Sequence, residues 1–122
     1  MMKTIFIVDD NRSNLLLAED ALSEHYEVIT LISAATMFEL LEDFAPDLIL
    51  LDIMMPDMDG ITALKLLKNN VRYAGIPIIF LTGNNDAKTE AQSFEMGVVD
   101  FILKPFTGTV LLNRINSILH NT

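Results

Sequence analysis

The 122-residue sequence contains no cysteine. A chain without cysteine forms no disulfide scaffold, zinc finger or iron–sulfur site, and it has no thiolate nucleophile. Because disulfides mark oxidising compartments, their absence fits a reducing one, and we expect a cytoplasmic protein.

Basic residues are scarce as well: 8 Lys and Arg stand against 17 Asp and Glu, and the formal net charge is −9. Affinity for a nucleic-acid backbone comes from clustered Lys and Arg, so we expect no direct nucleic-acid binding by this domain. A long apolar run is missing at the start of the chain, where residues 5–8 are apolar and the next two are acids. Neither a signal peptide nor a membrane span begins in this way, and no membrane association is expected.

Hydrophobic residues nevertheless make up 51% of the chain. Such a composition excludes disorder and allows roughly two thirds of the unfolded surface to be buried in one core. Because a domain usually contains about 100 to 200 residues, residues 1–122 are expected to form a single domain.

Short runs rich in Ile, Val, Leu and Phe recur along the chain, and each is typical of a strand buried on both faces. They cover residues 4–8, 27–31, 48–51, 76–81 and 101–103. Between and after them, apolar residues recur every three or four positions, which is the pattern of amphipathic helices. The helical positions are Leu15, Ala18, Leu22; Ala34, Met37, Phe38, Leu41; Ile61, Leu64, Leu67; Ala87, Ala91, Phe94; and Val110, Leu111, Ile115, Ile118, Leu119. This alternation predicts a doubly wound α/β domain with a five-stranded parallel sheet covered by helices on both faces.

Polar side chains follow four of the five predicted strands, at the edge where such sheets bind ligands. Asp9 and Asp10 follow the first strand, Asp52 the third, Thr82 the fourth and Lys104 the fifth. Two carboxylates about 5 Å apart repel each other by roughly 3 kcal/mol at an effective dielectric of about 20. Three clustered carboxylates therefore require a proton or a cation between them.

Each of these residues also has an ordinary structural interpretation. A lone Asp after a strand is most often a solvated acid or a helix cap, and a β-branched Thr fits any strand. A lone Lys is normally a surface residue. Their convergence on one edge of the sheet favours a functional site over these separate interpretations.

Oxygen ligands with no His or Cys nearby select a hard cation, and a partly hydrated Mg²⁺ (or Mn²⁺) suits this set. A divalent cation, a hydroxyl group and a lysine are the parts that phosphoryl transfer needs. The available nucleophile is the carboxylate of Asp52. Single residues exclude two other interpretations. A haloacid-dehalogenase-like phosphatase would have an acid at position 54, where this chain has Met54, and a calcium-binding EF-hand loop would have a Glu at position 66, where it has Leu66.

Three residues of the loop after Asp52 are interpreted as structural. Asp59 can cap the third helix, Gly60 relieves the turn, and Asp57 is a loop residue. Asn11 is interpreted in the same way, as the cap of the first helix.

Four segments carry a family resemblance: residues 7–10 (IVDD), 50–60 (LLDIMMPDMDG), 80–82 (FLT) and 104–106 (KPF). Together they resemble the receiver domain of two-component response regulators, and the resemblance extends from Lys3 to about His120. It implies a flavodoxin-like (βα)5 fold and a phosphorylation-switched signalling domain that is not a turnover enzyme.

The resemblance implies that Asp52 accepts a phosphoryl group from a histidine kinase or a histidine phosphotransfer protein. It also implies that Asp52 helps to bind Mg²⁺, with Asp10 as a direct ligand and Asp9 acting largely through water. The backbone carbonyl of Met54 would be a further ligand, so the apolar side chain at this position does no harm to metal binding.

The resemblance assigns roles to four more residues. Lys104 pairs with the phosphoryl group, and its peptide bond to Pro105 is expected to be cis. Thr82 swings its hydroxyl onto a phosphoryl oxygen, and Phe101 is the switch aromatic that fills the space left by Thr82. Plain core packing is the alternative for Phe101. The output is expected on the face of the fourth helix, fifth strand and fifth helix, around residues 88–95 and 110–119, through self-dimerisation or binding of another protein.

Two other functions stay open from the sequence. One is a phosphate-independent protein-interaction receiver, and the other is a Mg²⁺-dependent aspartyl phosphohydrolase that uses Asp52. The chain end at Asn121 and Thr122 is compatible both with a free-standing regulator and with the N-terminal receiver of a longer protein.

Overall fold

The computed structural model describes residues 2–83 and 87–120, and five strands alternate with five helices in these ranges. The strands are β1 (Thr4–Val8), β2 (Glu27–Leu31), β3 (Leu48–Asp52), β4 (Ile78–Thr82) and β5 (Asp100–Leu103). The helices are α1 (Arg12–Leu22), α2 (Ala34–Leu41), α3 (Gly60–Lys68), α4 (Ala87–Glu95) and α5 (Gly108–Leu119). The strands and helices follow one another in the order that the sequence pattern predicts.

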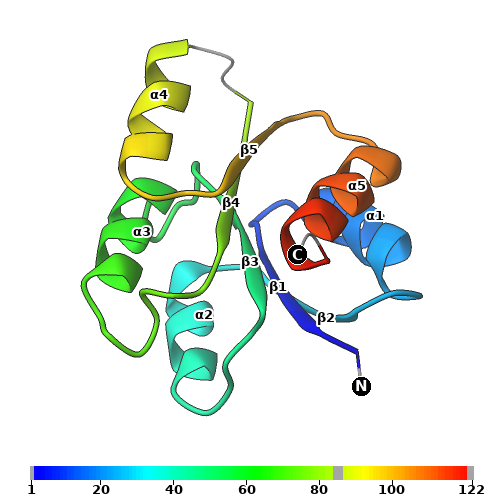
Figure 1. Cartoon of the computed structure of the whole chain (residues 1–122), viewed down its shortest axis with the longest axis horizontal. Helices are drawn as coiled ribbons and strands as arrows, with labels where there is room; N and C mark the ends of the chain where they lie inside the picture. Colours follow the sequence, from blue (N-terminus) through cyan, green and yellow to red (C-terminus); the bar gives the residue numbers. More distant parts are fainter. Residues whose placement is uncertain (1, 84–86, 121–122) are drawn as a thin grey trace.

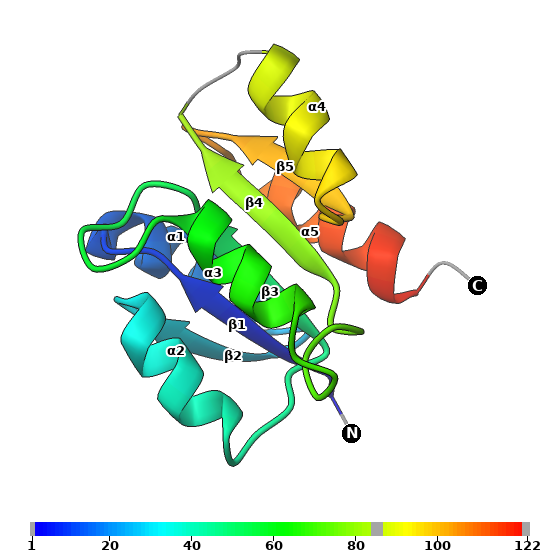
Figure 2. The same ribbon diagram turned by 90° about the vertical axis from the view of Figure 1, so that its left-hand side faces the viewer.

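The strands form one parallel sheet in the order β2-β1-β3-β4-β5. All strand arrows point to the same end of the sheet in Figure 2, so the residues that follow the strands meet there. The predicted doubly wound α/β architecture is therefore confirmed, and the carboxyl edge of the sheet is the place to look for a site.

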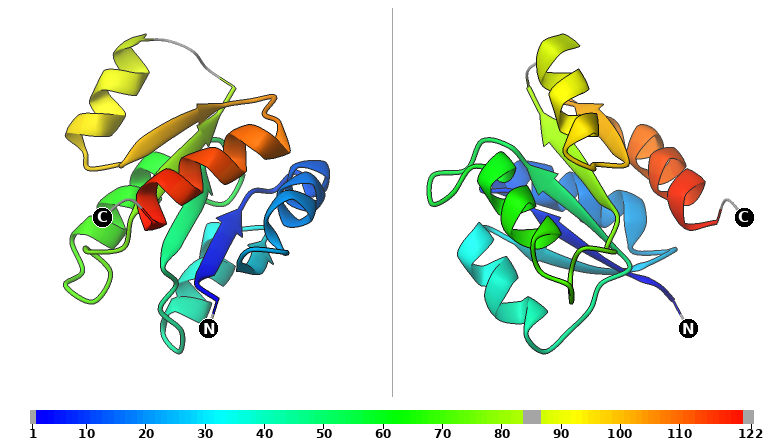
Figure 3. Two further views of the ribbon diagram at one scale, coloured as in Figure 1. Left: turned by 45° about the vertical axis from the view of Figure 1, so that its right-hand side comes forward. Right: turned by 60° about the vertical axis from the view of Figure 1, so that its left-hand side comes forward.

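Helices cover both faces of the sheet (Figure 1). Helices α1 and α5 pack against each other on one face, as the left view of Figure 3 also shows, and α2, α3 and α4 lie on the other. Each face has its own apolar core: Leu15, Ala18, Leu22, Leu111 and Ile115 fill the first, and Ala34, Met37, Leu41, Ala63, Leu64 and Leu67 fill the second. Within the described residues, no helix is long and apolar enough to cross a bilayer.

Strand burial differs from the prediction at the edge of the sheet. All residues of β3 and β4 are buried, but β2 is an edge strand whose first residue is exposed and whose next three are half-buried. An edge strand has a neighbour on one side only, so the expected burial on both faces was wrong for β2. Strand β4 begins at Ile78, two residues later than predicted, because Pro77 has no N–H to donate to the ladder.

Helix α4 exists, but the prediction of its buried face was wrong. Ala87 and Ala91 are exposed and Phe94 keeps 43% of its surface exposed, whereas Ser93 is buried. The hydroxyl of Ser93 donates a hydrogen bond to the Thr89 carbonyl oxygen at 2.8 Å, which makes its burial tolerable. Because α4 packs against β5 at the margin of the sheet, only a narrow side of the helix is covered.

Two predicted helix caps are confirmed. The side chain of Asn11 accepts a hydrogen bond from the backbone N–H of Asn14, and that of Asp59 accepts one from the N–H of Thr62 at 2.7 Å. These caps fix the starts of α1 and α3 directly beside the strand ends.

Candidate functional site

Four strand ends converge at the carboxyl edge of the sheet. Asp9 directly follows β1, Asp52 and Thr82 end β3 and β4, and Lys104 directly follows β5. The backbone continues the ladder past the strand ends, since the N–H of Lys104 donates to the Thr82 carbonyl oxygen at 2.7 Å. The sheet register therefore sets the positions of these residues before any side-chain contact is made.

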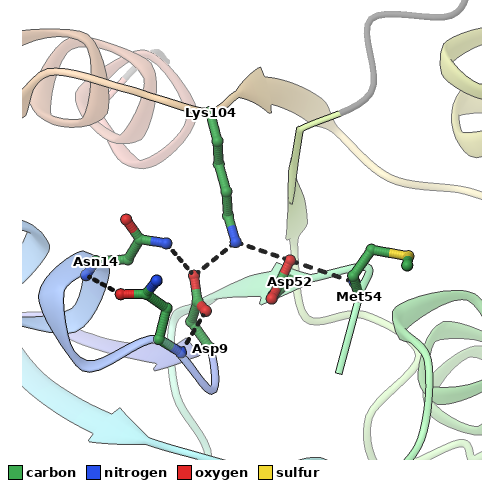
Figure 4. A network of polar contacts seen from close by, with 6 residues as sticks. Asp9, Asn14, Asp52, Met54 and Lys104 are labelled. Carbon is green, nitrogen blue, oxygen red and sulfur yellow. Dashed lines mark hydrogen bonds and ion pairs between the residues drawn. The ribbon is translucent and has the colours of Figure 1, made fainter. Parts of the chain in front are cut away.

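Lys104 connects two of the acids. Its Nζ lies 2.9 Å from Oδ2 of Asp9 and 3.0 Å from Oδ1 of Asp52. Dashed lines mark both ion pairs in Figure 4. Asp9 is fully buried and Asp52 is only 2% exposed. A buried carboxylate needs a compensating partner, and one ammonium group serves both acids here.

Asp9 has two further donors. The backbone N–H of Asn11 donates to its Oδ1 at 2.9 Å, and the side-chain amide of Asn14 donates to its Oδ2 at 3.1 Å. Asn14 was missed in the sequence analysis. The available signal was the position of Asn14 in the first turn of α1, four residues after Asp10. The first turn of a helix that follows a strand lies at the carboxyl edge of the sheet, where the acids also lie.

The acids also form a cluster that fits a divalent cation. One carboxylate oxygen from each of Asp9, Asp10 and Asp52 lies within 4.8 Å of the others, and Asp10 is exposed to solvent. Among the described residues, Lys104 is the ammonium group paired with these acids, and three carboxylates with one ammonium carry a net charge of −2. The all-oxygen donor set and this charge match one hard divalent cation such as Mg²⁺.

The pKa values reflect this crowding. Burial raises the pKa of Asp52 from 3.8 to about 6; the charge of Asp9 adds to this increase, and the hydrogen bond from Lys104 opposes it. Burial by itself lowers the pKa of Lys104, but the hydrogen bonds and charges of Asp9 and Asp52 outweigh it, so this pKa lies above its usual value. Lys104 is therefore fully charged, and Asp52 titrates just below neutral pH.

The remaining predicted site residues lie around this cluster. The backbone N–H of Met54 donates to Oδ1 of Asp52 at 3.3 Å, and the Met54 side chain is 73% exposed. Thr82 is buried at the end of β4. Phe101 is also buried, in the core that β5 shares with α2 and α3, and it has no place in the polar network. The peptide bond between Lys104 and Pro105 is cis.

Gly60 is required by close packing. A Cβ at this position would lie 2.6 Å from the backbone oxygen of Asp52 and 2.7 Å from Cα of Ile53. Its N–H donates to the Ile53 carbonyl oxygen at 2.7 Å. The predicted role of easing the turn is thus replaced by a steric one, since any side chain here would push the loop away from Asp52.

Comparison with known proteins agrees with this architecture. The sequence model of the family described as "Response regulator receiver domain" matches residues 5–116, which is most of the chain. The chain therefore belongs to the response regulator receiver family. Receiver domains are generally signalling switches of two-component systems and bind Mg²⁺ at an acidic pocket, and the cluster of Asp9, Asp10 and Asp52 could hold such an ion.

Curated relatives include two named regulators. The receiver domain is 36% identical over 119 residues to response regulator PleD of Caulobacter vibrioides, and it covers 26% of that protein. It is also 36% identical over 121 residues to the phosphate regulon transcriptional regulatory protein PhoB of Pseudomonas aeruginosa, of which it covers 53%. In these matches 97% and 98% of the present chain is aligned. The chain thus spans between about a quarter and about half of the length of these relatives.

A solved structure shows the same fold. The chemotaxis response regulator CheY4 of Vibrio cholerae superimposes with a TM-score of 0.91 at 25% identity, with 98% of this chain and 100% of that chain covered. The five-stranded sheet and its flanking helices therefore have the receiver fold seen in CheY4.

Proposed function

We propose that Asp52 accepts a phosphoryl group from a histidine kinase or a histidine phosphotransfer protein, and that the modified domain then changes its output face. The supporting observation is the bridge from Lys104 to both Asp9 and Asp52 inside an acidic cluster. This arrangement keeps Asp52 ionised at neutral pH and places a cation beside it, which is what a carboxylate nucleophile for phosphoryl transfer needs.

The two oxygens of Asp52 differ in their surroundings. Oδ1 accepts hydrogen bonds from Lys104 and from the N–H of Met54, whereas Oδ2 has no partner among the described residues. No fully buried side-chain oxygen or nitrogen in the described ranges lacks a hydrogen bond, so Oδ2 reaches solvent. In the proposed reaction an Asp52 oxygen forms a bond to phosphorus while the bond between phosphorus and the donor histidine nitrogen breaks and its electrons remain on that nitrogen.

Metal binding is assigned to Asp10, Asp52 and the Met54 carbonyl, with Asp9 acting through water. When bound, Mg²⁺ neutralises negative charge on the acids and on the incoming phosphoryl group. Asp9 is an outer ligand because its two oxygens already accept hydrogen bonds from Asn11, Asn14 and Lys104. Asp10 is exposed and therefore able to meet a hydrated cation directly.

Signal output is assigned to Thr82, Phe101 and the face formed by α4, β5 and α5. Thr82 lies at the strand end next to the acceptor, and Phe101 lies on the neighbouring strand, where β4 and β5 pair. The face has a hollow of about 370 Å³ lined in part by Leu103 and Val110, which are 44% and 38% exposed. Exposed apolar groups beside a hollow suit either a second copy of the domain or another protein.

The proposed function is tested by intact mass spectrometry after incubation with acetyl phosphate. We expect one labile phosphoryl adduct per chain with Mg²⁺ and none after EDTA, because an uncompensated acid cluster repels the phosphate. No adduct on a folded protein with Mg²⁺ would instead support a phosphate-independent interaction module. Sustained release of phosphate over many turnovers would support a phosphohydrolase.

Magnesium affinity is expected to depend on pH around the Asp52 pKa. Because burial raises this pKa to about 6, Asp52 binds a proton as the pH falls through 6, and the proton then competes with the cation. Between pH 7.5 and pH 5.5 we expect Mg²⁺ affinity, measured by isothermal titration calorimetry, to fall by about 3-fold or more. The same affinity at both pH values would contradict the assignment of Asp52 as a ligand.

A further inference from the structure

Asp57 makes a long-range contact that the loop interpretation does not explain. Its Oδ1 accepts a hydrogen bond from the backbone N–H of Ala34 at 3.4 Å, and its Oδ2 accepts one from the N–H of Ala35 at 3.0 Å. These partners lie 23 and 22 positions earlier in the sequence, at the start of α2. In Figure 2 and in the right view of Figure 3, the loop between β3 and α3 lies next to this end of α2.

The contact completes the N-terminus of α2. Ser33 caps this helix by accepting from the N–H of Thr36 at 3.2 Å, which leaves the N–H groups of Ala34 and Ala35 without an intrahelical acceptor. Asp57 accepts from both, and a negative charge at a helix N-terminus is also favoured by the helix dipole. A carboxylate with two backbone donors is held in a defined orientation and holds its own loop in return.

The loop that Asp57 secures carries a proposed metal ligand. Gly60 joins the base of the loop to Ile53 through a hydrogen bond of 2.7 Å, and the N–H of Met54 donates to Asp52 at 3.3 Å. Between these two attachments, among the described residues, Asp57 is the one side chain of the loop that hydrogen-bonds a distant element, and it accepts two such bonds, from Ala34 and Ala35. The position of the Met54 carbonyl thus depends on the base of the loop and on α2.

We propose that Asp57 is a positioning residue for the metal site: it anchors the loop between β3 and α3 to α2 and so keeps the Met54 carbonyl in place for Mg²⁺. This role rests on the proposed function. It also makes α2 part of the support of the metal site, although α2 contributes no ligand.

The test compares Mg²⁺ affinity in Asp57→Ala and Ser33→Ala by isothermal titration calorimetry, with thermal unfolding as a second readout. Each variant removes a cap of the same helix, so each should lower the melting temperature by a few degrees, but only Asp57→Ala releases the loop. We expect Mg²⁺ to bind about 5-fold more weakly to Asp57→Ala and within 2-fold of wild type to Ser33→Ala. Asp57→Asn keeps one of the two acceptor oxygens and should recover part of the loss.

Three results would overturn the positioning role. They are wild-type affinity in Asp57→Ala, an equal loss in Ser33→Ala, or no recovery in Asp57→Asn. Failure of the wild type itself to bind Mg²⁺ would be a different result, since it would reject the proposed function on which the role rests.

Discussion

The Asp52→Asn variant is expected to lose phosphorylation completely and to be more stable than the wild type when no metal is bound. The loss follows because an amide is not a nucleophile towards phosphorus. The gain follows because the ionised Asp52 is destabilising: burial and the charge of Asp9 raise its pKa to about 6, above the 3.8 of an exposed group. Asparagine keeps the shape, removes the charge and retains an oxygen that accepts from Lys104.

The sign of the pH dependence follows from proton binding. Between pH 3.8 and about 6 the folded wild type binds more protons than the unfolded chain, so its free energy of unfolding decreases as the pH rises through this window. Above pH 6 the ionised Asp52 lowers the free energy of unfolding of the wild type by its full amount. The Asp52→Asn variant should therefore be more stable than the wild type by about 1 to 3 kcal/mol at these pH values. Near pH 4 the difference should disappear, because the wild-type carboxyl group is then protonated in the folded protein.

Urea unfolding of both proteins in EDTA, at pH 7.5 and at pH 4.5, measures this effect. The expected result is a higher midpoint for Asp52→Asn at pH 7.5 and a much smaller difference at pH 4.5. Addition of Mg²⁺ should reverse the order at pH 7.5, since the variant loses a ligand. A less stable variant in EDTA at pH 7.5 would show that the charge of Asp52 is fully compensated by Lys104.

The Lys104→Met variant is expected to have the opposite effect on stability while also losing function. Lys104 is the ammonium group within hydrogen-bond distance of both the fully buried Asp9 and Asp52. Its removal leaves two buried carboxylates facing each other, and we expect the metal-free protein to lose about 1 to 3 kcal/mol at neutral pH. Phosphorylation by acetyl phosphate should slow by about 100-fold or more, because a cation that stabilises the transferred group is gone.

Rates of adduct formation and thermal unfolding in EDTA test this prediction, with Lys65→Met as the control because Lys65 is an exposed residue of α3. The double variant Lys104→Met with Asp52→Asn should regain stability relative to Lys104→Met, since one of the two uncompensated charges is removed. Phosphorylation of Lys104→Met at a rate close to that of Lys65→Met would contradict the assigned role.

The sequence predicted the fold and the acidic cluster because both depend on strand ends. Once five apolar runs alternate with helical segments, a parallel sheet places Asp9, Asp52 and Lys104 on one edge, whatever the details of packing. The bridge from Lys104 to both acids follows from this geometry, and the structure contains it.

The features that could not be predicted from the sequence depend on contacts between distant segments of the chain. The contact of Asp57 with Ala34 and Ala35 joins a loop to the start of α2, more than 20 positions away in the sequence, and no local pattern encodes it. The buried side of α4 was mispredicted because a small polar residue, Ser93, faces the sheet while Phe94 stays exposed. A spacing rule ranks residues by hydrophobicity and therefore selects Phe94.

The central claim is that Asp52 is the phosphoryl acceptor, and borohydride trapping tests it most directly. Borohydride reduces an acyl phosphate to an alcohol and so converts a phosphorylated aspartate into homoserine, which peptide mass spectrometry can locate. After incubation with acetyl phosphate and Mg²⁺, we expect homoserine at position 52, and none there when EDTA replaces Mg²⁺. Homoserine at position 9, 10 or 57, or no homoserine on a protein that carries the adduct, would contradict the account.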